Sequence, residues 1–214
     1  EKIDFKKCDE VGTILYVAID KKYVGYVLIA DKIKQDSSKT IRELKAMNIK
    51  ETVMLTGDKK EVGEYVAKKL NMDKVYTELL PDGKVEKVEE LLKQKSEKGK
   101  LVFVGDGIND APVLTISDIG VAMGGLGSDA AIEAADIVIM TDETSKISKA
   151  INLSKKTMRI VHENIIFAIF VKIAVLVLTA FGASTMWEAV FADVGVSVIA
   201  IINALRMLNI KKFE

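Results

Sequence analysis

Cysteine is almost absent from this sequence. Cys8 is the single cysteine among 214 residues, so no disulfide can form within the chain, and it lacks the neighbours of a cysteine metal site. We therefore expect the soluble part to lie in a reducing compartment, the cytoplasm. Net charge is absent as well, because 31 basic residues balance 31 acidic ones, and this removes the electrostatic reason for nucleic acid as a partner.

A secretory leader is also missing at the start of the chain. Glu1-Lys2-Ile3 shows neither a basic n-region nor an apolar h-region, and the first residue is not Met. This favours a start inside a longer protein. Apolar sequence is abundant: 49% of the residues are hydrophobic and 29% are charged, the balance of a globular protein and not of a disordered one.

Charge is unevenly spread: it is dense from Glu1 to Arg159 and sparse from Asn164 to Leu205. The sparse region holds two apolar runs, Asn164 to Ala183 and Trp187 to Leu205, each about 20 residues long, which is the helical length that crosses roughly 30 Å of hydrocarbon. The connection Ser184-Thr185-Met186 is too short for a domain. The two runs therefore predict a transmembrane hairpin.

The flanks of this hairpin predict its orientation. Basic residues stand on both sides of it and none lies in the turn. Because cytoplasmic flanks are enriched in Lys and Arg, both ends of the chain are predicted to be cytoplasmic. The basic residues are Lys155, Lys156 and Arg159 before the hairpin, and Arg206, Lys211 and Lys212 after it.

The charged region predicts an α/β fold. Thr13 to Ile19 and Tyr23 to Ile29 are β-rich runs that predict a hairpin or part of a meander. From Ser37 onward, amphipathic segments alternate with short apolar runs, the pattern of a parallel sheet covered by helices. The predicted strands are Thr52–Leu55, Lys74–Tyr76, Leu101–Val104, Ile119–Ala122 and Ile137–Met140. The predicted helices are Ser38–Met47, Lys60–Leu70, Lys84–Lys95, a short turn after Asn109, Ala130–Ala134 and Ser145–Ile160.

Three separate segments carry groups suited to phosphoryl transfer: Thr56-Gly57-Asp58, Lys84, and Gly105 to Asp110. In a doubly wound sheet the ligand crevice lies at the carboxyl ends of the strands, where Thr56 and Asp106 both fall. Phosphoryl transfer needs positive charge against the phosphoryl oxygens and a cation to bridge them, which Lys84 and Mg²⁺ held by Asp106 would supply. The sequence therefore predicts a phosphoryl-transfer site.

The third segment continues to Pro112, and together with the first two it resembles the motifs of P-type ATPases, which belong to the haloacid dehalogenase superfamily. The resemblance implies a haloacid-dehalogenase-like Rossmannoid fold followed by the transmembrane hairpin. Asp118 to Gly124 and Ala131 to Asp136 resemble the segment that follows this site, with a mainly structural role. The site residues implied are Thr56, Gly57 and Asp58 against an aspartyl phosphate, Lys84 paired with it, Asp106 and Asp110 for Mg²⁺, and Asn109 completing the site.

Two motifs of that family are missing from the chain. The Asp-Lys-Thr-Gly-Thr motif that is phosphorylated does not occur, and the His-Pro nucleotide motif is absent because His162, at the membrane boundary, is the only histidine. The resemblance thus covers the later part of such a protein. It implies the end of a nucleotide-binding domain in 1–30, the C-terminal part of a phosphorylation domain in 31–160, and the last two transmembrane helices with a short cytoplasmic tail in 161–214. Asp31 and Asp36 fall at the hinge between the first two of these, where simple surface charge is an equally good interpretation.

Lys172 and Asp193 place a charge inside each apolar run. A charge near the bilayer centre costs about 2.5 to 3.5 kcal/mol, so two of them require a reason. Their depths, counted from the hairpin turn, differ by about 6 Å, which is within the combined reach of the two side chains. We therefore expect the two to pair. The alternatives are that Lys172 snorkels and that Asp193 bonds a neighbouring helix.

The positions of these two charges resemble the zinc-, cadmium- and lead-exporting branch of P-type ATPases. That branch carries a Lys in the penultimate helix and Asp-x-Gly in the last one, which Lys172 and Asp193-Val194-Gly195 match. The Tyr-Asn and Met-Ser-Ser patterns of copper exporters are absent. The resemblance implies Asp193 as a ligand of the transported metal and Lys172 as its counter-charge, with thiolate ligands supplied by a Cys-Pro-Cys helix outside this chain.

The implied function is ATP-driven export of Zn²⁺, Cd²⁺ or Pb²⁺ through an aspartyl phosphate, with Mg²⁺ and ATP as cofactors. The expected partners are the preceding part of the same ATPase, membrane lipid and the transported ion, and the expected location is a bacterial plasma membrane. Two alternatives stay open. A soluble haloacid-dehalogenase-type phosphatase shares the Thr, Lys and Gly-Asp-Gly-x-Asn-Asp elements but has no need of two spans with opposed charges. The other is a non-catalytic, membrane-anchored remnant.

Overall fold

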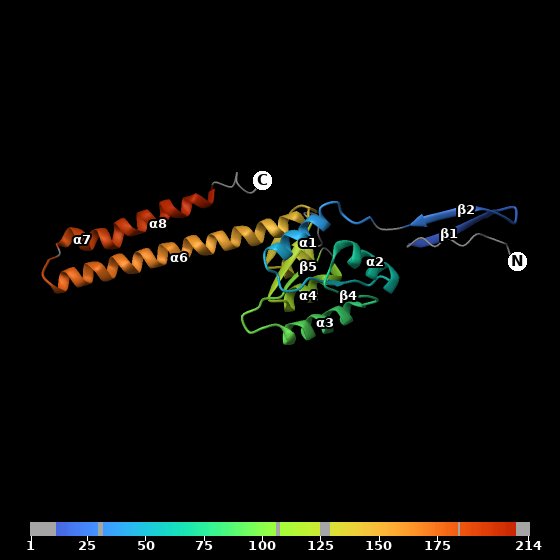
Figure 1. Ribbon diagram of the computed structural model, residues 1–214, viewed down its shortest axis with the longest axis horizontal. Helices are drawn as coiled ribbons and strands as arrows, with labels where there is room; N and C mark the ends of the chain where they lie inside the picture. The colour runs from blue at the N-terminus through green and yellow to red at the C-terminus, as the bar shows by residue number, and fades with distance from the viewer. Residues whose placement is uncertain (1–11, 30–31, 106–107, 125–128, 184, 209–214) are drawn as a thin grey trace. The chain divides into compact units, whose positions relative to one another are not determined.

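A computed structural model describes the chain apart from residues 1–11, 30–31, 106–107, 125–128, 184 and 209–214 (Figure 1). The chain divides into an amino-terminal unit, Glu1–Lys146, and a carboxyl-terminal unit, Ile147–Glu214. The predicted α/β character belongs to the first unit and the predicted apolar hairpin to the second.

The first elements form the predicted hairpin, in which β1 (Thr13–Ile19) pairs antiparallel with β2 (Lys22–Ile29). Asp20 and Lys21 turn the chain with φ values of 47° and 64°, the positive angles that a tight hairpin turn matching the strand twist requires. The hairpin buries little: Ile19, Val24 and Ile29 are each more than half exposed. An isolated two-stranded hairpin is only marginally stable in water, so we expect further strands or helices to cover these side chains.

An α/β body follows the hairpin. Its helices are α1 (Ser37–Ala46), α2 (Lys60–Leu70), α3 (Pro81–Gln94), α4 (Ala111–Ile116) and α5 (Asp129–Ala134). Its strands are β3 (Val53–Leu55), β4 (Lys74–Tyr76), β5 (Val102–Gly105), β6 (Ile119–Met123) and β7 (Ile137–Ile139), with a 3₁₀ turn, η1 (Ile108–Asp110), after β5. Each predicted strand and helix of this region is present, with boundaries shifted by no more than three residues at either end.

The predicted single sheet is not formed within the described part of the chain. β3 pairs in parallel with β4, and β5–β6–β7 form a second parallel sheet, while no ladder joins β3 to β5 among the described residues. Both β3 and β5 therefore present an edge with one side unpaired. The strands are parallel as predicted, but the sheet they belong to is interrupted between these two edges.

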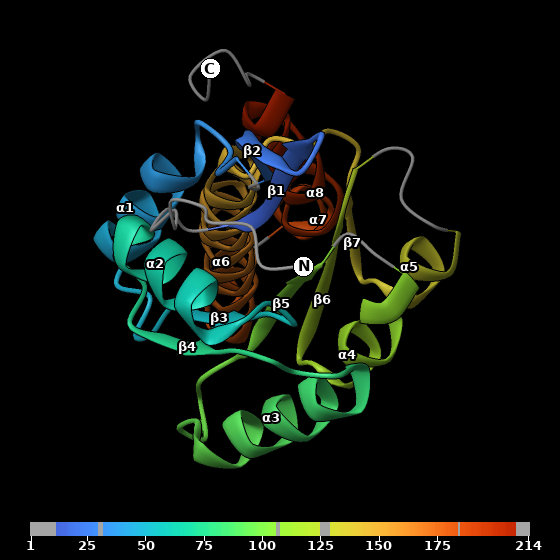
Figure 2. The same cartoon turned by 90° about the vertical axis from the view of Figure 1, so that its right-hand side faces the viewer.

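The core lies between α4, α5 and the three-stranded sheet (Figure 2). Leu114 of α4, Ala122 of β6 and Ala131 of α5 are almost fully buried, and Phe103 and Val138 pack against them. The close approach of α4 depends on Gly120, because a Cβ there would lie 2.6 Å from the carbonyl oxygen of Leu114. This packing fixes the beginning of α4 directly after the loop that follows β5.

Aspartates fasten the amino ends of the parallel strands. Asp73, just before β4, accepts hydrogen bonds from the Thr52 N–H and hydroxyl, 2.8 and 2.6 Å long, and from Lys45 Nζ. Asp118, just before β6, accepts from the Leu101 N–H at 2.7 Å, and Asp136, just before β7, accepts from the Gly120 N–H at 2.8 Å. The Lys45 and Thr52 bonds lower the pKa of Asp73 to about 2. Three carboxylates thus hold neighbouring strands in register at the edge opposite the predicted chemistry.

Asp36 lies directly before α1, but its side chain accepts a hydrogen bond from a different helix. Asp36 Oδ2 accepts a 2.8 Å hydrogen bond from the Ser145 N–H at the start of α6 (Ser145–Ala180). The same N–H is the main cause of the lowered pKa of the Asp36 carboxyl. Thr40, which is 2% exposed, lies 3.1 Å from the Thr144 hydroxyl through its own Oγ1. The segment before α1 is therefore tied to the start of α6, and the surface-charge interpretation of Asp36 is wrong; Asp31 lies outside the described residues.

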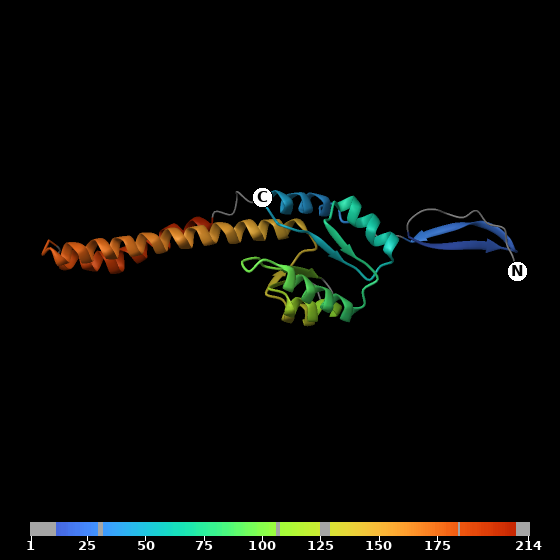
Figure 3. The same ribbon diagram turned by 60° about the horizontal axis from the view of Figure 1, so that its bottom comes forward.

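The carboxyl-terminal unit is a helical hairpin (Figures 1 and 3). α6 continues without a break for 36 residues, so the predicted end of a helix at Ile160 is wrong. The physical reason is that Val161, His162 and Glu163 include no Gly or Pro to stop it. The returning arm runs from Met186 to Leu208 through α7 (Met186–Val190), a π-helical turn η2 (Phe191–Gly195), α8 (Val196–Ala204) and a 3₁₀ turn η3 (Leu205–Leu208).

Both arms of the hairpin are long and apolar enough to cross a membrane, with mean hydropathies of 2.1 and 1.8. Within this chain their most apolar stretches are almost wholly exposed, whereas the core helix of a soluble fold is mostly buried. Thr185 caps the second arm in a reciprocal capping box with Glu188. Gly182, with a φ of 68°, lies in the turn between the arms.

Candidate functional site

A sheltered ion pair forms the centre of the candidate site in the amino-terminal unit. Lys84 Nζ lies 2.7 Å from Asp110 Oδ1, and the two side chains are only 20% and 11% exposed. Lys84 comes from the first turn of α3, which starts at Pro81, three residues earlier than predicted, because proline is favoured at the first helical position. Asp110 ends η1 and directly precedes α4. The pair thus joins two helix beginnings, and α3 packs against α4 (Figure 2).

Gly105, the last residue of β5, makes room for this pair. A Cβ at Gly105 would lie 2.8 Å from both Cβ and Oδ2 of Asp110 and 3.0 Å from the Phe103 ring. No side chain fits there without moving the carboxylate. Asn109 precedes Asp110 in η1 and is exposed. Asp106, the predicted main Mg²⁺ ligand, lies outside the described residues.

A second cluster lies where β3 ends. The Thr56 hydroxyl donates a 2.7 Å hydrogen bond to Asp58 Oδ2, and the Asp58 N–H donates back to Thr56 Oγ1 at 3.1 Å. The Leu79 N–H donates to the Thr56 carbonyl, which ties this turn to the loop leading into α3. Gly57 lets that loop approach, because a Cβ there would be 3.2 Å from the Leu79 carbonyl oxygen. Thr56, Gly57 and Asp58 therefore form one turn braced against the segment that carries Lys84.

No hydrogen bond or ion pair joins Thr56 or Asp58 to Lys84 or Asp110 in the part of the chain that the structure describes. The donors nevertheless fit Mg²⁺, since the oxygens of Asp110 and Asn109 are the hard ligands this ion prefers, and one or two carboxylates with phosphate and water suffice to hold it. No group of three or more His, Cys, Asp or Glu side chains gathers among the described residues, so a cage made of protein ligands alone is not present there.

A second ion pair lies in the carboxyl-terminal unit. Lys172 Nζ of α6 is 3.3 Å from Asp193 Oδ1 of the returning arm, as the estimate of similar depth predicted. In contrast to the first pair, these side chains are 60% and 76% exposed in this chain. Their surroundings within the unit are the apolar faces of the two arms.

Asp193 sits in the middle of the π-helical turn η2. Such wide turns are uncommon and occur frequently at functional sites. Gly195 permits the local packing, because a Cβ there would lie 2.5 Å from Cδ2 of the Phe191 ring. The Ser197 hydroxyl donates to the Asp193 carbonyl oxygen at 2.9 Å, which occupies a backbone acceptor in the widened turn. The sequence indicated Asp193 and Gly195 but gave no sign of the π-helical turn.

Comparison with protein families decides the fold of the first unit. The sequence model of the haloacid dehalogenase-like hydrolases matches residues 2–115. The chain belongs to this family. Its parallel strands, the Thr56 turn and the Lys84–Asp110 pair are therefore parts of a haloacid dehalogenase-like domain, as the motifs predicted.

Relatives of this haloacid dehalogenase-like chain include two curated transporters. It is 55% identical over 99% of its length to a cadmium, zinc and cobalt-transporting ATPase of Bacillus subtilis, and 53% identical over 97% of its length to a zinc-transporting ATPase of Synechocystis. It spans 30% and 29% of the length of these two relatives. Among solved structures, a zinc-transporting PIB-type ATPase in its E2·Pi state superposes with a TM-score of 0.83 at 34% identity, covering 91% of this chain and 31% of that one.

The similarity extends across both units, since 91% to 99% coverage includes the apolar hairpin. The family model by contrast stops at residue 115, before α6 begins. A haloacid dehalogenase-like domain continuing into two apolar helices is thus the architecture that this chain has in common with the P-type ATPases it resembles.

Proposed function

We propose that this chain is the part of a metal-exporting P-type ATPase that contributes one side of the phosphoryl-transfer site and one side of the metal pathway. The observation that carries the proposal is the Lys172–Asp193 ion pair inside an apolar hairpin, on the same chain as a haloacid dehalogenase-like site. A charge pair in that place has a cost that a simple membrane anchor has no reason to bear.

In the phosphoryl-transfer site, Lys84 supplies positive charge and Asp110 keeps its ammonium in place at 2.7 Å. The Thr56 hydroxyl is the candidate donor to a phosphoryl oxygen; because it carries a single proton, it would release its hydrogen bond to Asp58 in order to make this one. Asp106 and Asp110 are the proposed Mg²⁺ ligands, with Asn109 completing the polar lining. The bound ion would neutralise charge on the transferred group, which is what phosphoryl transfer demands.

The phosphorylated aspartate is proposed to lie outside this chain. Two features support this: the chain spans about 30% of the relatives' length, and both β3 and β5 have an edge that the described residues leave unpaired. The exposed apolar side chains of β1 and β2 likewise fit the last strands of a nucleotide-binding domain whose other strands cover them. We accordingly assign residues 1–30, 31–160 and 161–214 to the three parts that the sequence resemblance implies.

In the metal pathway, Asp193 is the proposed ligand and Lys172 the positive charge that replaces the ion after its release. A carboxylate oxygen is a suitable ligand for Zn²⁺ or Cd²⁺, and thiolates from elsewhere in the protein would complete the site. The names of the relatives support Zn²⁺ and Cd²⁺ and add Co²⁺ to the candidate cargo; Pb²⁺ stays a proposal from the motif alone. Basic residues on both flanks of the hairpin support cytoplasmic ends in a bacterial plasma membrane.

The phosphatase alternative is not favoured. A soluble phosphatase of the same fold would use the Thr56, Lys84 and Asp110 groups, but it would leave the two apolar arms and their ion pair unexplained. The relatives that match both units are transporters by name. The same coverage speaks against a non-catalytic remnant.

The function is tested by metal-stimulated ATP hydrolysis of the complete protein with Zn²⁺, Cd²⁺, Pb²⁺, Co²⁺ and Cu⁺ in turn. We expect stimulation by Zn²⁺ and Cd²⁺, and none in an Asp193→Asn variant, whose side chain keeps its size but loses its charge. Stimulation by Cu⁺ alone would overturn the assignment of the cargo.

The role of Lys172 is tested by transport into sealed vesicles. A Lys172→Ala variant is expected to bind metal and lose net transport, since Asp193 then lacks the charge that replaces the ion. Undiminished vectorial transport in this variant would show that Lys172 is not the counter-charge.

A further inference from the structure

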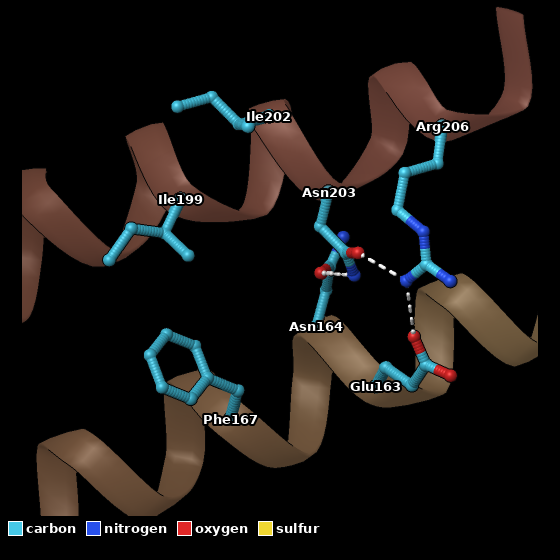
Figure 4. A pocket seen from close by; sticks show the side chains of 7 residues that line it. All are labelled: Glu163, Asn164, Phe167, Ile199, Ile202, Asn203 and Arg206. Carbon is cyan, nitrogen blue, oxygen red and sulfur yellow. Dashed lines mark hydrogen bonds and ion pairs between the residues drawn. The ribbon is translucent and has the colours of Figure 1, made fainter. Parts of the chain in front are cut away.

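A chain of hydrogen bonds joins the two arms of the hairpin at the end remote from the turn (Figure 4). Asn203 Nδ2 donates to Asn164 Oδ1 at 2.8 Å, and Asn164 Nδ2 donates to the Ala200 carbonyl oxygen at 3.1 Å. Arg206 donates to Asn203 Oδ1 at 2.8 Å and lies 3.4 Å from Glu163 Oε2. We call the pair Asn164 and Asn203 the amide bridge.

The order of donors and acceptors fixes the orientation of both amides. A backbone carbonyl can only accept and a guanidinium can only donate, so each end of the chain of bonds has one possible role. Asn164 must therefore turn its NH₂ toward Ala200, and Asn203 must turn its oxygen toward Arg206. The bond between the two amides then follows without a choice. Both asparagines are half-buried, whereas most of the apolar side chains around them are exposed.

The amide bridge and the turn are the two ends of the hairpin, and the Lys172–Asp193 pair lies between them. Along α6, Lys172 is about 12 Å from Asn164 and about 12 Å from the last residue, Ala180. A slip of one arm by one helical turn would move it about 5.4 Å, more than the 3.3 Å that separates Lys172 Nζ from Asp193 Oδ1. Apolar side chains alone resist such a slip weakly, because they can repack against one another in a new register.

We propose that the amide bridge sets the register of α8 against α6 and thereby positions Lys172 opposite Asp193. Asn164 and Asn203 are positioning residues for the metal pathway and do not touch the ion. The inference rests on the proposed function, since it gives the pair a role in metal release. When the bridge is lost, Lys172 no longer competes well for Asp193, and metal is held more tightly.

The test is a double-mutant cycle in the complete protein, with Zn²⁺ affinity measured by competition against a chromophoric chelator. We expect Lys172→Met to tighten Zn²⁺ binding about tenfold, because the competing charge is gone. Asn203→Leu is expected to tighten it about threefold, the size of a typical hydrogen bond between membrane helices. The double variant should match Lys172→Met alone. Asn152→Leu, at an exposed asparagine nearer the start of α6, is the matched control and should change nothing.

A second variant protects the test against misfolding. Asn203→Asp keeps the size of the side chain and the bond from Arg206, but it cannot donate to Asn164, so it should act in the same direction as Asn203→Leu. The proposal is overturned if both variants lower the thermal stability and leave Zn²⁺ affinity unchanged, or if the effects of Asn203→Leu and Lys172→Met add. A separate variant tests the transport site itself: if Asp193→Asn leaves Zn²⁺ affinity unaltered, the proposed function fails and the positioning role fails with it.

Discussion

Two lysine–aspartate pairs of this chain have the same chemistry and opposite settings. Lys84 and Asp110 lie 2.7 Å apart and are 20% and 11% exposed, while Lys172 and Asp193 lie 3.3 Å apart and are 60% and 76% exposed. The first is shielded by α3, α4 and the close approach that Gly105 permits. The second is bordered by apolar side chains that face outward.

The difference shows where each site is completed. The chain itself supplies the shelter of the Lys84–Asp110 pair, so its geometry is a property of the local fold. The Lys172–Asp193 pair depends on what surrounds the hairpin, because in hydrocarbon an exposed charge is costly, whereas in water it is nearly neutral in its effect. Exposure as high as that of Lys172 and Asp193 would therefore cost little in water and much in hydrocarbon.

The largest expected effect comes from removing the sheltered charge. Lys84→Met should lower ATP turnover of the complete protein about 100-fold, because positive charge against the transferred group is lost where little water can replace it. Steady-state hydrolysis measures it. Lys87→Met is the control, since Lys87 is on the same helix and pairs with Glu90. A loss of less than threefold in Lys84→Met would remove Lys84 from the site.

The next prediction tests whether Gly105 is needed for the burial of the Lys84–Asp110 pair. Gly105→Ala should destabilise the β5–α4 region by about 1–3 kcal/mol, because the new methyl group overlaps the Asp110 carboxylate at 2.8 Å. Hydrogen–deuterium exchange of β5 and α4 peptides measures it. Gly83→Ala in α3 is the matched control: its nearest neighbour would be 3.7 Å away, so a small gain in stability is expected. Equal exchange in the two variants would contradict the steric argument.

An intermediate case is the Lys45–Asp73 pair, 2.6 Å apart and 30% and 39% exposed. The pKa of Asp73 is lowered to about 2, which corresponds to about 2 kcal/mol of folding stability at neutral pH. Because the Asp73 side chain is partly exposed, solvent screening reduces this contribution to about 1 kcal/mol. Because the folded pKa lies below the ordinary 3.8, this contribution is present above about pH 4 and is lost as the pH falls toward 2. Exchange protection of β3 and β4 in Asp73→Asn should therefore be lower than that of the parent at pH 7 and approach it only near pH 2, where the Asp73 carboxyl of the folded parent becomes protonated.

The control for Asp73 is Asp142→Asn, at a side chain that is 71% exposed and paired with Lys34. It should leave the protection of β3 and β4 unchanged at every pH. A constant deficit of Asp73→Asn from pH 7 down to pH 2 would mean that shape, and not charge, accounts for the stabilisation.

The smallest expected effect concerns an exposed ion pair on a helix in water. Lys60 and Glu64 of α2 are 3.8 Å apart and 69% and 56% exposed, close to the exposure of Lys172 and Asp193. Glu64→Gln should change the stability of α2 by less than about 0.5 kcal/mol, the usual worth of such a helix pair in water. The hydrogen exchange rates of α2 amides measure this change. A more than tenfold faster exchange in Glu64→Gln would show that exposure alone does not predict how much an ion pair stabilises a helix.

Much of the fold followed from the sequence, for clear physical reasons. Lys60–Leu70 and Lys74–Tyr76 were predicted at their observed bounds, because helical and strand periodicities are local properties. The continuity of α6 could not be predicted, because the composition changes from polar to apolar near residue 160 while the helix itself continues. The interrupted sheet was missed because strand pairing depends on partners far along the chain, which no local pattern reports.

The site divides in the same way. Asp110 belongs to a motif that follows β5, and Lys84 is singled out by the resemblance to a family motif. The structure brings the two side chains together, while their role in phosphoryl transfer stays a prediction. The roles of Asp73, Asp118 and Asp136 as acceptors for neighbouring strands could not be predicted, because a single aspartate before a strand is commonplace. Asn164 and Asn203 gave no signal at all: two asparagines 39 residues apart acquire meaning only when a hairpin sets them side by side.

The unbroken α6 also has a mechanical consequence. A straight helix of 36 residues is about 54 Å long, and Lys172 stands about 40 Å from its start at Ser145. At that lever arm, a tilt of about 5° displaces the lysine by about 3.5 Å, as much as the whole length of its ion pair.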